Sequence, residues 1–494
     1  MIKNQVKQFI LSQKFISKLP LSFLVLIFFV PIVLLKINYR IGLYFIAFYI
    51  SYWTIKVFES YFYVITSYLK LLNLNAKDYS NSDIIKKDAK NLKHIIIVPF
   101  YSEPYDVIED NVISIINNVY PHKNNITILL APEERWIDTI INAEKIIKKF
   151  KNSGVEIVSI VHPSWLPGEW KVKWANITYA IKEYIKDKNL DEQMTYVSTI
   201  DTDTKVEKNF FTIVAYTYLT TEKNTNAIYQ YTPVYSNNWN KWTFFARLIA
   251  MWTTFWQLSE SQNPEFYRNF AVYGMSLSCL KKSDYWSKTS IVEDWLQYWR
   301  SYFAWSGVFR IVNVPAVCMM DVVEEETLIK TINSQYKQLR RWSWWCSDLE
   351  YVIPEFYKNK KIKNWEKIRK VFYLIFNHLF WSGWALTLFF IGYLPGVVDN
   401  LKNSIITLTI PLSVSLIFTM IFATIAFPSF ISILIMRKYV NFRKRDYAIN
   451  ILQWLLIPTL TLTLFSLPAI ESQIRYFFNK RIDFFESTKK MKRK

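Results

Sequence analysis

The chain has 494 residues, of which 51% are hydrophobic and 18% aromatic, and its formal net charge is +20. This length allows a sizeable core and more than one domain. Its three cysteines and four histidines are scattered, which excludes a disulfide scaffold, a cysteine-based zinc site and an HExxH site. The eight glycines form neither GxGxxG nor GxxxxGK, so the sequence lacks a dinucleotide fingerprint and a P-loop. No nucleic-acid module accompanies the positive charge, so nucleic acid is not expected as a partner.

Two apolar runs of about membrane length open the chain, Pro20–Leu35 and Ile41–Phe58. The gap between them is short, so we expect a helical hairpin within residues 1–72. Four lysines and no acids precede Leu19, which places the N-terminus in the cytoplasm and returns the chain there after two crossings. We do not expect a cleaved signal peptide, because no small-residue cleavage pattern follows and a second apolar run comes at once.

Residues 73–365 are more polar, and strand-like apolar runs alternate there with helical patterns. This alternation predicts an α/β domain built on a parallel sheet. A loop, Tyr101-Ser102-Glu103-Pro104, is expected directly after the first strand. The predicted strands are His94–Pro99, Asn125–Leu130, Val155–Val161, Thr195–Ile200 and Ala227–Gln230, and the predicted helices between them include Asp106–Val119 and Thr139–Phe150.

Apolar segments resume after Trp365, within residues 366–494. The candidates are Val371–Leu394, Ser404–Phe427 continuing through Met436, and Tyr447–Ile470. Basic residues lie between the last two and again from Lys489 to Lys494. An even number of crossings keeps this basic tail on the cytoplasmic side, so an even number is expected.

Asp201-Thr202-Asp203 follows the fourth predicted strand, at the edge of the sheet where α/β proteins tend to bind ligands. Residues two apart on an extended chain point to the same side, so both carboxylates are expected to face one ligand. Hard carboxylate oxygens suit Mg²⁺ or Mn²⁺, which can neutralise charge on a departing diphosphate. The alternative is an ordinary acidic turn after a strand.

Glu293 and Asp294 form a second acidic pair, before Trp295. A carboxylate in a cleft can take the proton from an attacking hydroxyl group. The alternative is a pair of solvated acids at a helix start, where they suit the helix dipole.

The third motif is QLRRW, in which Gln338, Arg341 and Trp342 are spaced i, i+3 and i+4. A helix presents such residues on one face. The guanidinium of arginine suits phosphate oxygens, and tryptophan offers a flat face to a sugar ring. The alternative is an interfacial helix with a basic and aromatic belt at a bilayer surface, which the neighbouring Trp344 and Trp345 favour.

The order DTD, ED and QxxRW, followed by membrane segments, resembles the processive family-2 membrane glycosyltransferases, which include cellulose and hyaluronan synthases. The resemblance covers roughly residues 90–350 and the flanking membrane architecture. Pro99, Tyr101 and Glu103 look like the loop after that family's first strand. The stretch from Gly168 to Asn176 looks like the lysine-containing segment before the DxD motif.

This resemblance implies a GT-A fold between transmembrane segments, and inverting transfer from a nucleotide sugar, UDP-hexose or UDP-N-acetylhexosamine, with Mg²⁺ or Mn²⁺. Carried over, Asp203 is the main metal ligand with Asp201 beside it, and Asp294 is the general base within the Glu293-Asp294 pair. The donor diphosphate is contacted by Gln338, Arg341 and either Lys171 or Lys173, and Trp342 stacks on the acceptor sugar. The implied location is a prokaryotic plasma membrane with the catalytic domain in the cytoplasm.

The chain departs from the family after the second strand, where an aspartate usually reads the nucleotide base. Here Glu133 or Glu134 stands nearby, which leaves the nucleotide open. The acceptor is also open, because QxxRW favours a polysaccharide whereas a lipid-linked acceptor needs no channel. Two readings compete with transfer. One is a DxDxT phosphatase with Asp201 as nucleophile, although the chain has no Gly-Asp pair, and the other is an inactive membrane scaffold.

Overall fold

The computed structural model describes residues 11–75, 77–239, 243–397 and 426–482, and single positions between 405 and 419. Most of the predicted span Ser404–Phe427 lies outside the described residues, as do Lys3, Lys7 and the basic tail. The chain divides into two compact units. Among the described residues, one comprises residues 11–65 with residues 332–482, and the other comprises residues 66–331.

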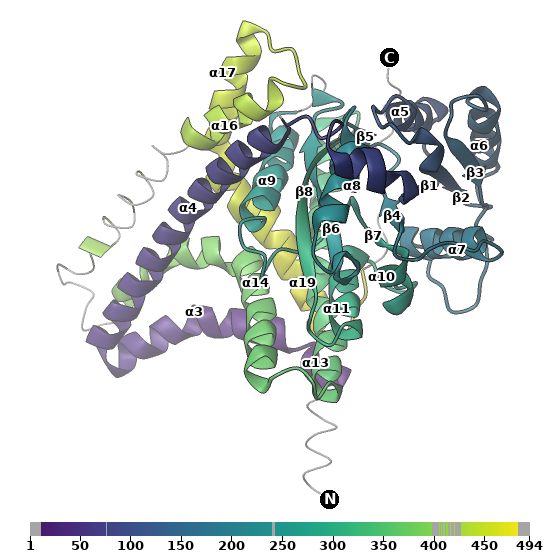
Figure 1. Cartoon of the computed structure of the whole chain (residues 1–494). Helices are drawn as coiled ribbons and strands as arrows, with labels where there is room; N and C mark the ends of the chain where they lie inside the picture. The colour runs from purple at the N-terminus through teal and green to yellow at the C-terminus, as the bar shows by residue number, and fades with distance from the viewer. Residues whose placement is uncertain are drawn as a thin grey trace, which may run out of the picture. The chain divides into compact units, whose positions relative to one another are not determined.

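The second unit is an α/β domain around one eight-stranded sheet with the order β3-β2-β1-β4-β7-β6-β8-β5 (Figure 1). The predicted α/β class is confirmed, but the sheet is mixed rather than parallel. β7 runs antiparallel to both β4 and β6, and β5 runs antiparallel to β8. The strands are β1 Lys93–Phe100, β2 Ile126–Pro132, β3 Glu156–Ser159, β4 Thr195–Thr199, β5 Lys205–Val206, β6 Ala227–Tyr235, β7 Tyr273–Ser276 and β8 Arg310–Met320.

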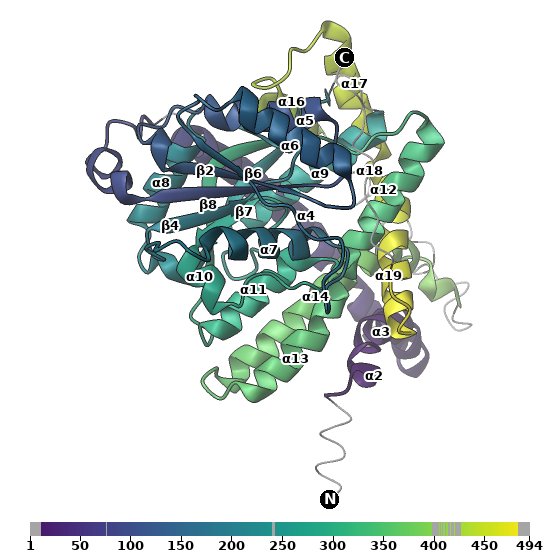
Figure 2. The same cartoon turned by 90° about the vertical axis from the view of Figure 1, so that its right-hand side faces the viewer.

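Helices cover both faces of this sheet. α5 and α6 lie on one face, and α7 and α10 lie on the other (Figure 2). This arrangement follows from the crossovers. The chain moves outward from β1 to β3 through α5 and α6, then returns past β1 to β4 through α7. The helices of this unit are α5 Tyr105–Ile116, α6 Ile137–Lys149, α7 Lys173–Ile185, α8 Phe210–Thr220, α9 Phe244–Glu260, α10 Leu277–Lys282 and α11 Glu293–Ala304.

The central strands are continuous apolar runs because both of their faces are covered. Every residue of β2 is buried, and in β1 only Lys93 is exposed. Gly274 of β7 is the point of closest approach, since a Cβ atom there would collide with the rings of Tyr196 and Tyr231 on the neighbouring strands. Only glycine fits between these two buried tyrosines.

The first unit is helical. Four helical segments among the described residues are long and apolar enough to cross a membrane, namely Gln13–Ile37, Tyr39–Asn75, Asn364–Ile391 and Lys444–Phe477. The first three match the predicted spans, and the fourth contains the predicted Tyr447–Ile470. The helices are α2 Gln13–Ile16, α3 Leu19–Ile37, α4 Tyr39–Asn75, α12 Leu328–Trp342, α13 Leu349–Lys358, α14 Asn364–Ile391, α16 Ala426–Met436, α17 Lys444–Leu452, α18 Ile457–Leu460 and α19 Leu467–Phe477. The boundaries between the two units fall within α4 and within α12.

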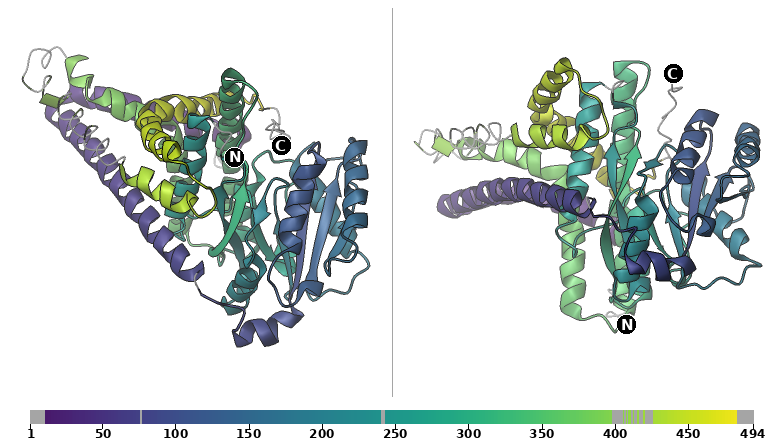
Figure 3. Two further views of the ribbon diagram at one scale, coloured as in Figure 1. Left: turned by 90° about the horizontal axis from the view of Figure 1, so that it is seen from above. Right: turned by 45° about the horizontal axis from the view of Figure 1, so that its top comes forward.

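The predicted hairpin is present, with α3 and α4 meeting at a sharp corner (Figure 3). Asn38 makes this corner, because its backbone is extended and its side chain accepts a hydrogen bond of 3.1 Å from the Arg40 backbone N–H. Gly42 allows the helices to approach there, since a Cβ atom would lie 2.7 Å from Leu35.

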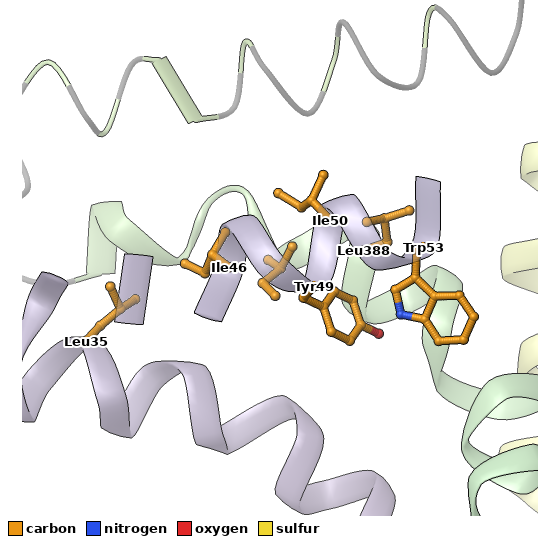
Figure 4. Close-up of a cluster of buried hydrophobic side chains, with 7 residues drawn as sticks. Leu35, Ile46, Tyr49, Ile50, Trp53 and Leu388 are labelled. Atoms are coloured by element: carbon orange, nitrogen blue, oxygen red, sulfur yellow. The ribbon is translucent and has the colours of Figure 1, made fainter. Parts of the chain in front are cut away.

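A buried cluster joins α3, α4 and α14 within this unit (Figure 4). Trp53 anchors it, stacked on Phe376 with ring centroids 6.2 Å apart. Outward-facing positions of α3 and α4 are also apolar, as Phe29 and Ile55 show with exposed fractions of 58% and 66%. Apolar residues on both the inner and outer faces are typical of helices that lie in a bilayer. The cluster consists of Leu35, Ile46, Tyr49, Ile50, Trp53, Leu388 and Ile391.

Candidate active site

The segment from Asp201 to Thr204 is a turn and not the extended chain that the same-side argument assumed. The backbone N–H of Thr204 donates to the carbonyl of Asp201 at 2.9 Å, and the Thr202 hydroxyl donates to the carbonyl of Pro99 at the end of β1. Asp203 is buried with 4% exposure, whereas the Asp201 side chain is 25% exposed. The two carboxylates therefore differ in their access to solvent.

Two asparagines, which the sequence did not single out, hold this turn. Asn111 of α5 donates to the carbonyls of Asp201 at 3.2 Å and Thr204 at 2.6 Å. Asn237, which follows β6, donates to the carbonyls of Asp203 at 2.8 Å and Met319 at 2.9 Å. Side-chain amides thus replace the ladder hydrogen bonds that the chain loses when it leaves β4.

Lys173, the first residue of α7, forms an ion pair with Asp201, with 2.5 Å between Nζ and Oδ1. The other candidate lysine, Lys171, is exposed. The sequence left open which of the two lysines approaches the diphosphate. In the structure, Lys173 is the one that contacts Asp201. Its ammonium also lies 4.6 Å from the ring centroid of Trp174.

The loop after β1 faces the same turn. The Glu103 carboxylate accepts hydrogen bonds from the backbone N–H groups of Tyr101 at 2.6 Å and Ser102 at 3.1 Å. Burial, and after it the negative charge of Asp203, raise the pKa of Glu103 above its usual value. Glu103 therefore shapes the loop and adds negative potential beside Asp203.

Glu133 is engaged in a buried network. Its carboxylate lies 2.8 Å from Arg135 and 3.5 Å from His162, and His162 in turn lies 3.1 Å from Glu169. Burial acts to raise the pKa of Glu133, but the hydrogen bonds from His162 and Arg135 outweigh it and hold the pKa below its usual value. Glu134 is exposed and accepts a hydrogen bond from the Ser164 backbone N–H at 2.7 Å.

Glu293 and Asp294 open α11 and differ in exposure. Glu293 is fully buried and accepts a hydrogen bond of 2.8 Å from the Ser287 backbone N–H. Asp294 is partly exposed, and its Oδ2 accepts a hydrogen bond of 3.1 Å from the Ala271 backbone N–H. Asn269 donates to the carbonyl of Asp294. Of the pair, Asp294 is therefore the less buried residue, although its Oδ1 atom lies away from solvent.

Strand pairing connects Asp294 to the aspartate turn. Tyr273 of β7 pairs with Thr199 of β4, and because these strands are antiparallel, β7 begins where β4 ends. Ala271, which binds the Asp294 carboxylate, lies two residues before Tyr273, and Asp201 lies two residues after Thr199. The two acidic motifs, 90 residues apart in sequence, thus meet at the same edge of the sheet.

No group of three or more His, Cys, Asp or Glu residues in the described part of the chain is arranged to hold a metal ion. Asp201 and Asp203 nevertheless fit a divalent cation in one respect, since Mg²⁺ typically takes one or two carboxylates and completes its coordination with substrate phosphates and water. The pairing of Asp201 with an ammonium group also shows that this position favours a cation.

The third motif lies on α12, whose C-terminal part belongs to the helical unit. Gln338 is buried, and Arg341 and Trp342 are half-buried. The helix through Trp342 is as predicted, so the three residues share one face. Arg340 of the motif forms an ion pair with Glu471 of α19 at 2.7 Å, and Tyr336 also bonds to Glu471, at 2.9 Å.

These contacts group the motif with the helices, whereas the sequence assigned it to the domain of residues 73–365. The domain limits stay a prediction. The sequence analysis did not use Glu471, an acidic residue within an apolar segment. Such a residue commonly pairs with a basic one, and here it pairs with Arg340.

Comparisons with known proteins gave structural likenesses only. No protein-family model and no curated sequence match the chain. Among solved structures, the chain is similar to a mannosyltransferase from Pyrobaculum calidifontis in complex with GDP-mannose and Mn²⁺. Identity is 10%, the TM-score is 0.45, and 87% of this chain and 99% of that chain are covered.

It is also similar to S. aureus TarS 1–349 in complex with UDP-GlcNAc, with 14% identity, a TM-score of 0.37, and 62% and 82% of the two chains covered. For GalNAc-T7 with UDP, GalNAc and Mn²⁺, the corresponding values are 9%, 0.30, 52% and 51%.

Proposed function

We propose that this chain is a membrane-bound glycosyltransferase that moves a sugar from a nucleotide-diphosphate donor to a hydroxyl group of a glycan, with inversion. The observation that carries the proposal is the meeting of two acidic motifs at one sheet edge through the β4–β7 pairing. A partly exposed acidic residue and an acidic turn at one site supply the two groups that such a transfer needs, a base and a charge-neutralising centre.

In the proposed reaction, Asp294 takes the proton from the acceptor hydroxyl as its oxygen attacks the anomeric carbon of the donor sugar. The bond between that carbon and the diphosphate oxygen breaks, and the nucleoside diphosphate leaves with the bonding electrons. Asp294 then passes its proton to water. One displacement inverts the anomeric configuration. The Ala271 N–H keeps the carboxylate oriented before the reaction.

Asp201 and Asp203 are the residues that would hold Mg²⁺ or Mn²⁺. A bound metal ion would neutralise negative charge on the departing diphosphate. Lys173 adds a positive charge at the same place. We further propose that Pro99, Tyr101 and Glu103 shape the donor pocket, and that Gln338 and Arg341 contact the diphosphate. In this proposal Trp342 stacks on the acceptor sugar.

Glu133 is the candidate to face the nucleotide base, but its carboxylate is already bonded to Arg135 and His162. UDP-hexoses and UDP-N-acetylhexosamines remain the expected donors, and GDP-sugars are the alternative to test. We propose a polysaccharide or other glycan as acceptor because of the QxxRW helix, with a lipid-linked acceptor as the alternative. The proposed location is a prokaryotic plasma membrane with the site on its cytoplasmic side.

The experiment is to measure nucleotide release by the purified full chain across UDP- and GDP-sugars, with and without Mn²⁺ or Mg²⁺, and with membrane lipids and oligosaccharides as acceptors. We expect metal-dependent release from one donor, lost in Asp203→Asn. The matched control is Asp191→Asn, at a loop aspartate that accepts hydrogen bonds from the Gln193 and Met194 backbone N–H groups, which should keep activity. No release under any condition would contradict the proposal and favour the inactive scaffold.

A further inference from the structure

The Lys173–Asp201 pair has a consequence for how a cation reaches the aspartate turn. The ammonium lies 2.5 Å from Oδ1 of Asp201, and the two side chains are only 20% and 25% exposed. Two opposite charges at this distance attract each other strongly, and the limited solvent around them screens the attraction only weakly. In this state, a cation already occupies the Oδ1 side of the carboxylate.

A divalent cation that coordinates Asp201 meets two obstacles. It must approach an oxygen that the ammonium contacts, and it is repelled by the positive charge of Lys173 at close range. Both obstacles disappear if the lysine side chain swings away. Lysine has a flexible four-carbon stem and is suited to such movement.

The surroundings of Lys173 give its ammonium a partial alternative to Asp201. Its Nζ lies 4.6 Å from the ring centroid of Trp174, which is 5% exposed. A tryptophan ring face attracts a cation, although less strongly than a carboxylate does. The ammonium can thus leave Asp201 without becoming fully solvated.

We propose that Lys173 and a divalent cation compete for the Asp201 carboxylate. In the metal-free protein, Lys173 neutralises Asp201 and weakens the affinity for metal alone. When a metal-bound diphosphate arrives, Lys173 releases Asp201 to the metal and its ammonium binds a diphosphate oxygen. Metal and donor thereby bind cooperatively, because the donor provides the new partner that the displaced lysine needs. This inference rests on the proposed function, since it takes a nucleoside diphosphate as the ligand.

The test is a titration of the full chain with Mn²⁺ alone, in which electron paramagnetic resonance measures the free ion. Lys173→Met removes the ammonium and keeps the side-chain length, so we expect Mn²⁺ to bind roughly tenfold more tightly than to the wild type. Lys173→Arg keeps the charge and should bind like the wild type. Lys171→Met, at the exposed lysine two residues earlier, is the matched control and should also bind like the wild type.

A second titration uses UDP and GDP in the presence of Mn²⁺. Lys173→Met should bind the nucleoside diphosphate more weakly than the wild type, so the cooperativity between metal and nucleotide should fall. Mn²⁺ affinity that is unchanged or weaker in Lys173→Met, or absent in every variant, would overturn the inference. If Lys173→Met does not fold, Lys173→Gln makes the same comparison.

These binding results are independent of turnover. A chain that shows the predicted Mn²⁺ competition but transfers no sugar from any donor would contradict the proposed function and leave the competition standing. A chain that transfers sugar while Lys173→Met binds Mn²⁺ like the wild type would keep the function and reject the competition.

Discussion

Backbone strain marks one residue of the site. Ala271 has a φ of 53°, in the left-handed region that residues other than glycine rarely adopt, and its N–H group binds the Asp294 carboxylate. Such strain costs on the order of 1–3 kcal/mol and persists only where the surroundings determine the conformation. The Asn269 side chain, fully buried and bonded to the Asp294 carbonyl, is part of those surroundings. The short segment from Asn269 to Ala271 is therefore built to orient Asp294.

His94 is a buried residue that makes the stability of the protein depend on pH. Its ring is 1% exposed among Tyr120, Tyr196 and Phe211, and burial lowers its pKa to about 3. The folded protein therefore keeps His94 neutral, while the unfolded chain takes up a proton below about pH 6.5. Because the folded pKa is the lower one, stability falls as pH falls between these two values.

We predict that His94→Phe flattens this pH dependence. Wild-type stability should lose about 1 kcal/mol per pH unit from His94 alone between about pH 6 and pH 4. The measurement is the thermal unfolding midpoint of the detergent-solubilised protein at several pH values, for wild type and variant. Equal pH slopes in the two proteins would contradict the buried, neutral state of His94.

At the scale of elements, the site depends on how α5 and the segment after β6 hold the turn that follows β4. Asn111 is 1% exposed and reaches two carbonyls of that turn. Its spacing from Val107 and Ile108 places it on the buried face of α5, but the local sequence does not show which carbonyls it binds. Its role arises only when the parallel pairing of β1 and β4 brings α5 beside the turn.

We predict that Asn111→Ala destabilises the protein by about 1–3 kcal/mol, because the Thr204 carbonyl loses its side-chain donor and the Asp201 carbonyl keeps only the Thr204 N–H. It should also weaken Mn²⁺ binding, since the aspartate turn loses its support. Asn118→Ala is the matched control, because Asn118 donates to the Glu207 carbonyl at 2.7 Å, which lies beyond the aspartate turn. The control should lower the unfolding midpoint but keep Mn²⁺ affinity. Similar Mn²⁺ affinities in the two variants would refute the role of Asn111.

The predictable elements were those with local signals. β1 and β2 are buried apolar runs and lie within a residue or two of their predicted bounds. β7 could not be predicted as a strand, because it has only four residues and contains Gly274, which is unfavourable in a strand except at a close approach. Since β7 carries the link between Asp201 and Asp294, the sequence identified the acidic motifs but not the pairing that joins them.

At the scale of the whole molecule, composition predicted apolar helices before and after an α/β domain in the sequence, and the structure has them among its described residues. α4 continues to Asn75, beyond the predicted end at Phe58. Across this predicted end, Lys56 within the apolar run and Glu59 just beyond it form an ion pair at 2.6 Å on one helix face. Such a pair lets a helix continue out of an apolar stretch, whereas a hydropathy pattern ends where charges begin.

The most direct test of the account is a comparison of Asp294→Asn with the wild type, because it separates the proposed chemical step from binding. Donor binding is measured by calorimetry with Mn²⁺ and the nucleotide sugar that the wild type uses, and transfer is measured with the same preparation. We predict that transfer falls by roughly 10²–10⁴-fold, the range of general base catalysis, while donor affinity changes little. Wild-type transfer rates in Asp294→Asn would contradict the assignment of the base and with it the proposed mechanism.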